Sequence, residues 1–319
     1  MSAFLSAVVP AAGASRRMGF DKLLTEISGV SLLEYTLQRL LQSPQIGELI
    51  VVVAPDSEKS VRLIIDKLKE SRPIKIVHGG AERQDSVLAG LLATDPATEY
   101  VMIHDAARPF VTPQLIELVA KAAQENGAAV CGQPSTDTLK EAAPNGMIAG
   151  TLDRGKIWAV QTPQVFQRTL IIDAYQQVIK AGKTVTDDTA AVSALGKPVK
   201  LVLNEEINLK VTRPIDWTIA SYILAALDED VAMLSMMRKL IHDISNQITS
   251  VMGFSFLLDM DVPEDSPLKS HVTSLNDSSN KCLGIVGEMQ SLAREMQGKK
   301  IAMHKKMGGS QAPATPFGH

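Results

Sequence analysis

The sequence predicts an α/β protein with a mostly parallel sheet, a projecting β-arm and a C-terminal α-helical hairpin. Three observations lead to this prediction. Before residue 225, short β-branched runs alternate with amphipathic helical patterns, which is typical of βαβ units whose sheet is covered on both faces. Residues 133–157 interrupt the alternation. The last 95 residues hold nine of the 13 methionines and neither of the two tryptophans, so we expect a separate region there.

The alternating region contains predicted strands and helices in regular succession. The strands are short apolar runs: Ser6–Val9, Leu49–Ala54, Ile74–Val77, Tyr100–His104, Ala128–Cys131 and Val199–Leu203. The helices lie between them: Ser31–Gln42, Glu58–Glu70, Gln84–Ala93, Pro113–Asn126 and Arg168–Ala181. Thr112 before Pro113 is a typical N-cap followed by a proline at the first helical position. Ser31 with Glu34 matches a capping box.

Residues 133–157 predict a β-hairpin that projects from the sheet. Pro144-Asn145-Gly146 is a turn signal between two short extended runs. A projecting arm of this kind either covers a ligand site or contacts a second subunit.

Composition and charge exclude several classes of protein. The chain has 319 residues, of which 45% are apolar, and a formal net charge of −3. This balance argues against a strongly basic nucleic-acid binder. The apolar runs are too short to span a bilayer. The cysteines, Cys131 and Cys282, make neither a disulfide framework nor a metal cluster, so we expect a reducing, cytoplasmic location. From the charge and the short apolar runs we expect neither a nucleic-acid nor a membrane partner.

Small and cationic residues follow the first predicted strand. They are Ala11, Ala12 and Gly13, then Arg17 and Lys22. Ligands of open α/β sheets bind outside the carboxyl ends of the strands. Small residues let the backbone approach a ligand closely, so that its N–H groups can face phosphate oxygens. The loop matches neither a Walker A nor a dinucleotide-binding pattern. It indicates a polyphosphate site, and the alternative is a strand-to-helix turn with a solvated basic face.

Asp105 and Arg108 follow the fourth predicted strand. An aspartate at a strand end is a hard oxygen ligand suited to Mg²⁺, and the alternative is an aspartate that caps a turn or helix. His104 precedes Asp105 on an apolar strand. We expect its side chain to be packed and hydrogen-bonded rather than catalytic.

Five motifs occur in series between about residues 6 and 224. They are P-A-A-G-x-x-x-R-M, G-G-x-E-R-x-D-S-V, H-D-A-A-R-P, T-P-Q and K-V-T-R-P. Each is weak alone, but the series resembles the 2-C-methyl-D-erythritol 4-phosphate cytidylyltransferase family of the non-mevalonate isoprenoid pathway. The resemblance implies a Rossmann-like nucleotidyltransferase fold and transfer of CMP from CTP to methylerythritol phosphate, with Mg²⁺ as cofactor. A cytidylyltransferase for ribitol 5-phosphate or another polyol phosphate shares these motifs and is the alternative.

The resemblance implies roles for individual residues. Catalytic roles are implied for Arg17, Lys22, Arg154 and Lys210. Nucleotide contacts are implied for Ala11, Ala12, Gly13, Gly80, Arg83 and Ser86. Contacts to the polyol phosphate are implied for Asp105, Arg108, Thr162, Thr186 and Lys210, with Asp105 also the metal ligand. The attacking phosphate oxygen is already ionised at pH 7, so the reaction needs cations and positioning rather than a general base.

The resemblance also implies a homodimer. Arg154 and Thr186 are similar to residues that the family donates across a dimer interface, which favours an arm that clasps a second subunit. Ala81 and Asp21 depart from the usual family pattern. The implied charged positions are all present, which argues against the alternative of a signalling scaffold built on an inactive enzyme.

Two long helical patterns follow the motif region. Apolar residues spaced three and four apart predict an antiparallel hairpin over 227–298. The seam residues are Leu234, Met237, Ile241, Ile244, Ile248, Val251 and Leu258, then Val272, Leu275, Ser279, Cys282, Val286, Met289, Ala293 and Met296. One hairpin buries only a stripe, so two hairpins of a dimer would close a four-helix bundle. We expect the tail, 299–319, to be disordered.

The first of these helices carries His242-Asp243-Ile244-Ser245-Asn246. The segment resembles the phosphoacceptor box H-[DE]-x-x-N of sensor histidine kinases, although Gln247 replaces the usual proline. The resemblance implies a phosphoacceptor that serves a separate kinase or response regulator. We expect no self-phosphorylation, because no ATP-binding domain follows in this sequence. The alternatives are a purely structural dimerisation bundle and an unrelated solvent-facing histidine.

Overall fold

The computed structural model of the protein describes residues 5–13, 18–263 and 266–306. The chain divides into two compact units, Met1–Tyr222 and Ile223–His319. The boundary lies inside one long helix, α7 (Pro214–Asp261).

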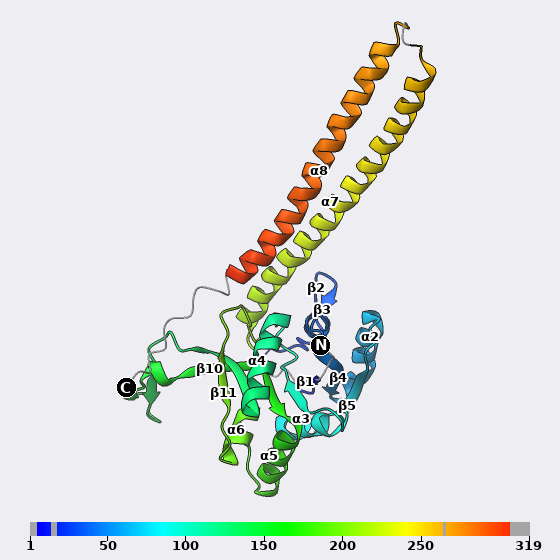
Figure 1. The fold of residues 1–319 in the computed structure, drawn as a ribbon. Coiled ribbons are helices and arrows are strands. Elements are labelled where there is room, and N and C mark those ends of the chain that lie inside the picture. The colour runs from blue at the N-terminus through cyan, green and yellow to red at the C-terminus, as the bar shows by residue number, and fades with distance from the viewer. Residues whose placement is uncertain (1–4, 14–17, 264–265, 307–319) are drawn as a thin grey trace. The chain divides into compact units, whose positions relative to one another are not determined.

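A seven-stranded sheet forms the centre of the first unit (Figure 1). The strand order is β11-β7-β10-β6-β1-β4-β5. β10 is antiparallel to β6 and β7, and the other neighbours pair in parallel. The prediction of a mostly parallel sheet is therefore confirmed. The strands are β1 (Leu5–Pro10), β4 (Ile46–Val53), β5 (Ile74–His78), β6 (Tyr100–Ile103), β7 (Ala128–Pro134), β10 (Trp158–Gln167) and β11 (Lys200–Leu203).

Helices cover both faces of this sheet. They are α1 (Leu32–Leu41), α2 (Glu58–Leu68), α3 (Arg83–Leu92), α4 (Pro113–Asn126), α5 (Arg168–Lys180) and α6 (Asp188–Ala194), with the short 3-10 helix η1 (Pro55–Ser57) before α2. Residues of α3, α5 and α6 share one apolar core with Val8 and Ile50 of the sheet. The alternate strand residues Val9 and Val51 are buried as well. Because successive side chains of a strand point to opposite faces, both faces must be covered.

Side-chain caps begin two of the helices where the sequence predicts them. The Ser31 hydroxyl accepts a hydrogen bond from the backbone N–H of Glu34 at 3.2 Å. The Thr112 hydroxyl accepts one from the backbone N–H of Leu115 at 3.1 Å. Each cap satisfies one of the amides that a helix N-terminus leaves without an intrahelical partner.

The sequence does not reveal β10, the antiparallel strand between β6 and β7. Its segment contains Pro163, and a proline argues against a central strand. In the structure, the pairing of β10 with β7 is irregular between Val160 and Gln164. Pro163 lies within this irregularity, so its missing N–H takes no hydrogen bond from the regular ladder. The same irregularity leaves Thr162 beside the end of β6, where its hydroxyl accepts the backbone N–H of Asp105 at 3.0 Å.

The segment 133–157 contains the expected hairpin arm. β8 (Lys140–Ala142) pairs with β9 (Ile148–Thr151) in antiparallel orientation. Gly146 in the turn has a φ of 80°, a backbone conformation that favours glycine. The 3-10 helix η2 (Arg154–Lys156) follows the hairpin. A separate small sheet pairs β2 (Glu26–Ile27) with β3 (Val30–Ser31).

The second unit is a helical hairpin of α7 and α8 (Lys269–Lys306), as expected (Figure 1). Its helices are longer than the predicted 227–298. α7 begins at Pro214 because no glycine or proline interrupts the helical pattern from there until Gly253. α8 continues through 299–306, which corrects the predicted start of the disordered tail at 299, and residues 307–319 lie outside the described part. No helix among the described residues is long and apolar enough to cross a membrane.

Part of the predicted seam lies between the two helices of the hairpin. Ile241 and Val286 form a buried apolar cluster with Ile248 packed against it. Val272 and Ser279 are buried too. These positions recur every seven residues along each helix, and this half of the predicted seam is confirmed.

The other half of the predicted seam is exposed, which corrects the sequence prediction. The exposed seam residues are 40–49% accessible: Ile244, Val251, Leu258, Leu275 and Met289. Cys282 is exposed as well. Two helices meet along one narrow line, whereas the apolar arc of each helix is wider than that line. The seam side chains of Leu234, Met237, Ala293 and Met296 lie outside the described residues.

Candidate active site

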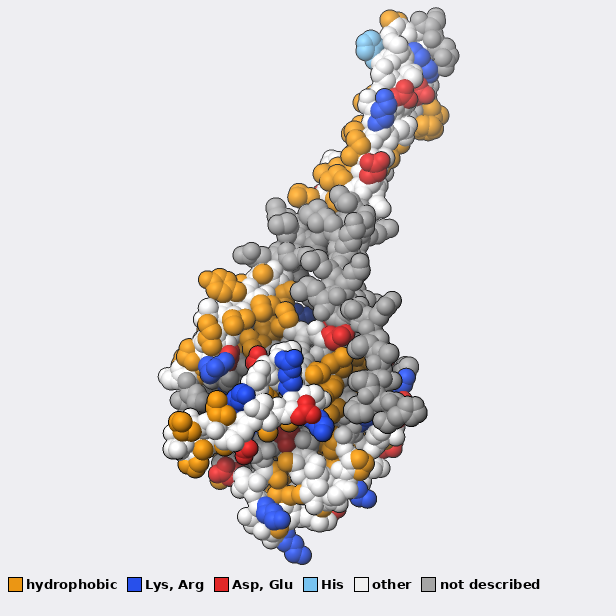
Figure 2. All heavy atoms as spheres, turned by 90° about the vertical axis from the view of Figure 1, so that its left-hand side faces the viewer, with side chains coloured by type: hydrophobic (Ala, Val, Ile, Leu, Met, Phe, Trp, Pro, Cys, Tyr) orange, Lys and Arg blue, Asp and Glu red, His pale blue; other side chains and the backbone are white. Residues whose placement is uncertain are grey.

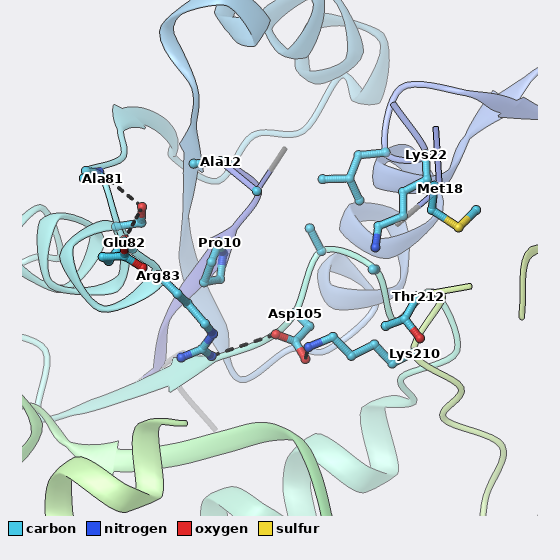
Figure 3. Close-up of a pocket in the computed structure, with 16 residues that line it drawn as sticks. Pro10, Ala12, Met18, Lys22, Ala81, Glu82, Arg83, Asp105, Lys210 and Thr212 are labelled. Carbon is cyan, nitrogen blue, oxygen red and sulfur yellow. Dashed lines mark hydrogen bonds and ion pairs between the residues drawn. The ribbon is translucent and has the colours of Figure 1, made fainter. Parts of the chain in front are cut away.

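A cavity of about 540 Å³ lies at the carboxyl ends of β1, β5 and β6 (Figure 3). Open α/β sheets bind their ligands at this position. The cavity is lined by Pro10, Ala12, Gly13, Met18, Lys22, Leu23, Gly80, Ala81, Glu82, Arg83, Ser86, Asp105, Ala106, Ala107, Lys210 and Thr212. It therefore brings together eight of the residues singled out from the sequence, which come from four separate segments.

Asp105 is the centre of the charge network in this cavity. Its Oδ2 lies 2.8 Å from Lys210 Nζ and 3.3 Å from Arg108 Nε, and its Oδ1 lies 3.9 Å from an Arg83 nitrogen. Burial opposes ionisation of this carboxyl, but Lys210 and Arg108 outweigh it and hold the pKa of Asp105 well below its usual range. The ionised carboxylate thus fixes three cations around one point.

His104 supports the Asp105 loop from inside the protein. The ring is fully buried, with Nε2 3.1 Å from the Arg108 carbonyl oxygen and Nδ1 3.2 Å from the Thr162 hydroxyl. These partners fit a neutral ring that donates from Nε2 and accepts at Nδ1. Burial lowers the pKa of His104 to about 4. As expected, this histidine is packed and hydrogen-bonded, and it positions the loop.

Arg83 is held by Asp188, which the sequence analysis missed. Two guanidinium nitrogens of Arg83 donate to the two Asp188 oxygens at 2.8 Å each. The buried Tyr175 hydroxyl donates to the same carboxylate. Burial opposes the charge on Arg83, but Asp188 outweighs it and raises the pKa of Arg83. A bidentate pair fixes the plane of a guanidinium, so Arg83 enters the cavity in one orientation (Figure 3).

The sequence contains only a weak indication that Asp188 has a role in the site. It follows Asp187, whose side chain caps α6 by accepting the backbone N–H of Ala190 at 3.0 Å. One of two adjacent aspartates was therefore available for another role. The partner, Arg83, is 105 positions away, and no local pattern connects the two.

The loop after β5 brings the backbone close to the cavity. A Cβ on Gly79 would lie 2.6 Å from Ser86 Oγ and 2.7 Å from the Ala12 Cβ, and one on Gly80 would lie 2.4 Å from the Asp85 Cβ. These approaches are too close for any side chain. The Gly80 N–H donates to Ser86 Oγ at 3.1 Å, which ties the loop to the first turn of α3.

Two lysines from distant segments point into the cavity (Figure 3). Lys22 Nζ donates to the Val211 carbonyl oxygen at 2.8 Å. Val211 follows Lys210, and its own N–H donates to the Ala107 carbonyl oxygen at 2.9 Å. Together with Arg83, the lysines give the cavity an excess of positive charge. Such a surface attracts and orients phosphate groups.

Three other residues singled out from the sequence lie behind the cavity lining. Ala11 is buried, and its N–H donates to the Val52 carbonyl oxygen at 2.7 Å. Arg108 is buried and donates to the Asn208 carbonyl oxygen at 2.7 Å in addition to its contact with Asp105. Thr162 is buried beside Asp105. These residues hold the shape of the cavity.

Two predicted residues, Arg154 and Thr186, do not line the cavity within the described part of a single chain. Arg154 is exposed on η2, where it donates to the Thr136 carbonyl oxygen at 3.0 Å. Thr186 is exposed just before α6. Arg17 lies outside the described residues.

The described residues fit a metal that binds together with phosphate groups. Among them, no three His, Cys, Asp or Glu side chains are grouped to hold a metal ion. Asp105 supplies a carboxylate, but three cations already surround it. Magnesium is usually held by one or two carboxylates with substrate phosphates and water rather than by an all-protein cage. The site suits such a shared ion and not a resident one.

Comparison with known proteins identifies the first unit. The family model of 2-C-methyl-D-erythritol 4-phosphate cytidylyltransferase (IspD) matches residues 5–226. The chain belongs to this family. Proteins with that name from Pelotomaculum thermopropionicum and Syntrophus aciditrophicus are 39% and 42% identical to it over 225 and 221 residues. These matches cover 70% and 68% of this chain and 94% of each relative.

Solved structures agree with this assignment. The 4-diphosphocytidyl-2C-methyl-D-erythritol synthase of Anaerococcus prevotii aligns with a TM-score of 0.63 at 31% identity, covering 70% of this chain and 99% of that one. The 2-C-methyl-D-erythritol 4-phosphate cytidylyltransferase of Thermus thermophilus aligns with a TM-score of 0.57 at 32% identity, covering 68% and 98%. The protein is thus an enzyme of the cytidylyltransferase class, and residues 227–319 lie beyond the family match.

Proposed function

We propose that the protein transfers CMP from CTP to 2-C-methyl-D-erythritol 4-phosphate, giving 4-diphosphocytidyl-2-C-methyl-D-erythritol and pyrophosphate. The observation that carries the proposal is the cavity in which Lys22, Lys210 and Arg83 surround a site beside the ionised Asp105, in a chain of this family. The attacking oxygen belongs to the methylerythritol phosphate. Its bond to the α-phosphorus of CTP forms as the bond to pyrophosphate breaks.

Each part of the cavity has a proposed role in this reaction. The small residues Ala11, Ala12 and Gly13 let the backbone contact the nucleotide phosphates. Gly80, Arg83 and Ser86 contact the cytosine. Lys22 and Lys210, with Arg17, stabilise the negative charge that develops at the α-phosphate, which is the main obstacle when one anion attacks another. Asp105, Arg108 and Thr162 position Lys210 and the second substrate.

Magnesium is the proposed cofactor, since enzymes of this family generally depend on a divalent metal. When bound with CTP, it would neutralise phosphate charge. Asp105 is the residue that would contact it or its water shell. The chain's own contribution is the orientation of Lys22 and Lys210 around the phosphates.

The test of the proposal is pyrophosphate release from CTP in the presence of each polyol phosphate. We expect release with 2-C-methyl-D-erythritol 4-phosphate and a kcat/KM for it far above that for ribitol 5-phosphate. Preferred turnover of ribitol 5-phosphate would assign the alternative substrate. No release with either would favour the inactive scaffold.

We further propose that the active enzyme is a homodimer. Arg154 and Thr186 are exposed and lie outside the cavity of their own chain, which suits residues that complete the cavity of a second copy. Met147 and Ile148 at the arm are also largely exposed, which suits contact with a partner. Mixing an Arg154→Ala chain with a Lys210→Ala chain tests this idea, because heterodimers would regain one intact site. Mixtures that stay as inactive as either variant alone would contradict it.

A reducing cytoplasm is the proposed location. The two cysteines are unpaired, with Cys131 buried and Cys282 exposed. Burial also raises the pKa of Cys131 to about 12, so this thiol has little reactive thiolate at neutral pH. Mass spectrometry of the protein in cell extract should find Cys282 as a free thiol.

A second proposed function concerns His242 in the hairpin. Its ring is exposed, and Nδ1 lies 3.3 Å from Asn246 Nδ2 and 3.6 Å from Asp243 Oδ1. With its proton on Nδ1, beside the Asp243 carboxylate, the neutral ring carries its lone pair on Nε2, so we propose Nε2 as acceptor of a phosphoryl group from a response regulator or separate kinase. A purely structural hairpin is the alternative.

Labelled phosphate transfer tests this second function. A response regulator charged with labelled acetyl phosphate should transfer label to the chain, and His242→Gln should abolish the transfer. His271→Gln changes another exposed histidine of the hairpin and should leave it intact. No acid-labile label with any donor, together with full cytidylyl transfer in His242→Gln, would leave the structural alternative.

A further inference from the structure

The hairpin carries an uncovered apolar stripe on each of its helices. The exposed residues Ile244, Val251 and Leu258 recur every seven residues along α7. Leu275, Cys282 and Met289 recur with the same step along α8. A strict seven-residue apolar repeat is the signature of a helix that packs against another helix along its length. In the described hairpin these positions do not face the neighbouring helix.

The two stripes lie on the same side of the hairpin. In both helices the exposed stripe follows the buried one by three residues: Ile244 follows Ile241, and Cys282 follows Ser279. A step of three residues turns a helix by about 300°, or −60°. α7 and α8 run in opposite directions. Viewed from one end of the hairpin, the same turn along the chain is therefore clockwise in one helix and anticlockwise in the other. Both stripes therefore face one side.

Three of the six side chains that flank these stripes, one turn from a stripe residue, extend the same apolar face: Leu240 and Phe254 on α7 and Ile285 on α8. The other three, Gln247, His271 and Ser278, are polar but carry no Lys, Arg, Asp or Glu charge. Within 240–258 and 271–289 this face, which we call the bundle face, carries no Lys, Arg, Asp or Glu. Figure 2 shows hydrophobic side chains exposed along the edges of the hairpin, with charged and polar side chains between them. An uncharged exposed face of this length marks an interaction site.

We propose that the bundle face binds the bundle face of a second copy of this chain, closing a four-helix bundle. The occupant is a second copy, because both helices present the same repeat in the same phase and a twofold axis then places this face against an identical face. The described face spans about 28 Å at 1.5 Å per residue over 240–258. With helix axes about 10 Å apart, the two copies would bury about 1,100 Å² in total, enough for a specific interface.

The bundle leaves His242 in solvent. His242 is two residues before Ile244, which is a turn of about 160° around the helix. The imidazole therefore lies almost opposite the bundle face. Self-association and access of a phosphate donor are thus compatible.

The distance between Cys282 residues of two copies provides the test. Cys282 is exposed and lies on the bundle face, whereas Cys131 is buried, so a spin label placed on the full-length protein reports the hairpin alone. In a four-helix bundle the two labels should be about 10–20 Å apart, since neighbouring axes are 8–10 Å apart and diagonal ones about 14 Å. A pairing of the first units alone would give no such fixed short distance.

Two matched double variants separate the bundle face from the rest of the hairpin. Val251→Glu with Leu258→Glu adds two charges to the bundle face. Thr249→Glu with Phe256→Glu adds them seven residues apart, two residues before each stripe residue and so almost opposite the bundle face of the same helix, where Phe256 is also exposed. The first pair should abolish the short Cys282 distance, and the second should preserve it. Unchanged helical circular dichroism verifies folding, and cytidylyl transfer should be unaffected because none of these residues lines the cavity.

Three results would overturn the proposal. The wild-type protein could lack the short distance at every concentration, which would leave the face to a different partner. Both double variants could keep it, or both could lose it while staying helical. Each result would show that the exposed stripes do not join two copies.

Discussion

The two units differ in how completely they bury their apolar residues. In the first unit, strand residues such as Val8 and Val9 are completely buried although they point to opposite faces of the sheet. In the second unit, Ile241 is buried while Ile244, one turn away, is 42% exposed. A sheet with helices on both faces closes its own core, whereas two helices bury only the line between them. The comparison teaches that the first unit closes its own apolar core, whereas the hairpin leaves half of its predicted seam uncovered.

Among the changes that test this comparison, we expect the largest effect on activity from replacing Lys210 in the first unit. Lys210→Ala removes a cation from the cavity and a partner 2.8 Å from Asp105. We expect kcat/KM to fall about 1,000-fold, as for loss of a preorganised group that stabilises transition-state charge. Steady-state pyrophosphate release measures it. Lys197→Ala, at an exposed lysine outside the cavity, is the control and should have no effect; equal losses in both variants would contradict the role of Lys210.

Asp188→Asn should have the next largest effect. It removes the charge that fixes Arg83 while keeping the size of the side chain. We expect KM for CTP to rise about 10-fold and the free energy of unfolding to fall by about 2 kcal/mol, below the value for a fully buried pair because Arg83 is 35% exposed. Kinetics and urea unfolding measure these changes. Asp187→Asn is the neighbouring control, since asparagine also caps a helix. Similar kinetics in both variants would refute a positioning role for Asp188.

As the pH falls, the first unit should lose stability through His104 before its carboxylates become protonated. His104 has a folded pKa of about 4 against an ordinary value of 6.5. Between these two pH values the unfolded chain binds a proton at His104 that the folded chain does not bind. The contribution of His104 to the free energy of unfolding is therefore fully present above pH 6.5 and is lost as the pH falls towards 4. The loss should be about 3 kcal/mol.

Urea unfolding followed by tryptophan fluorescence measures this loss, since both tryptophans, Trp158 and Trp217, belong to the first unit. His104→Gln should be less stable at pH 7 and should show a smaller dependence on pH between 6.5 and 4.5. A wild-type stability that is flat across this window would rule out the neutral buried histidine.

The smallest expected effect is removal of the hairpin. The described cavity residues lie between Pro10 and Thr212, so a chain that ends at residue 226 should keep its kcat/KM within about two-fold, as for distant uncoupled sites. The full-length chain is the reference in the same assay. A loss above 10-fold would break the comparison, because the enzyme would then need the hairpin or the dimer that the hairpin forms.

The sequence was a good guide where physical causes were local. Apolar runs, the Ser31 and Thr112 caps and the turn at Gly146 placed their elements within a few residues, because caps and turns depend on neighbours in the chain. It failed at β10, where Pro163 argued against a strand and only pairing with β6 and β7 compensates. It failed again at Asp188, whose partner Arg83 is 105 positions away.

The sequence alone determined which residues can do chemistry and that two different regions share the chain. The series of motifs and its resemblance to a known family pointed to Lys22, Asp105 and Lys210, and the change in composition near residue 225 separated the hairpin. Only the tertiary structure decided how these residues act. It placed Lys210 against Asp105 and fixed Arg83 on Asp188, and it buried Ile241 while leaving Ile244 exposed. Periodicity defines the width of an apolar arc, but which part of the arc meets a neighbour depends on where that neighbour lies.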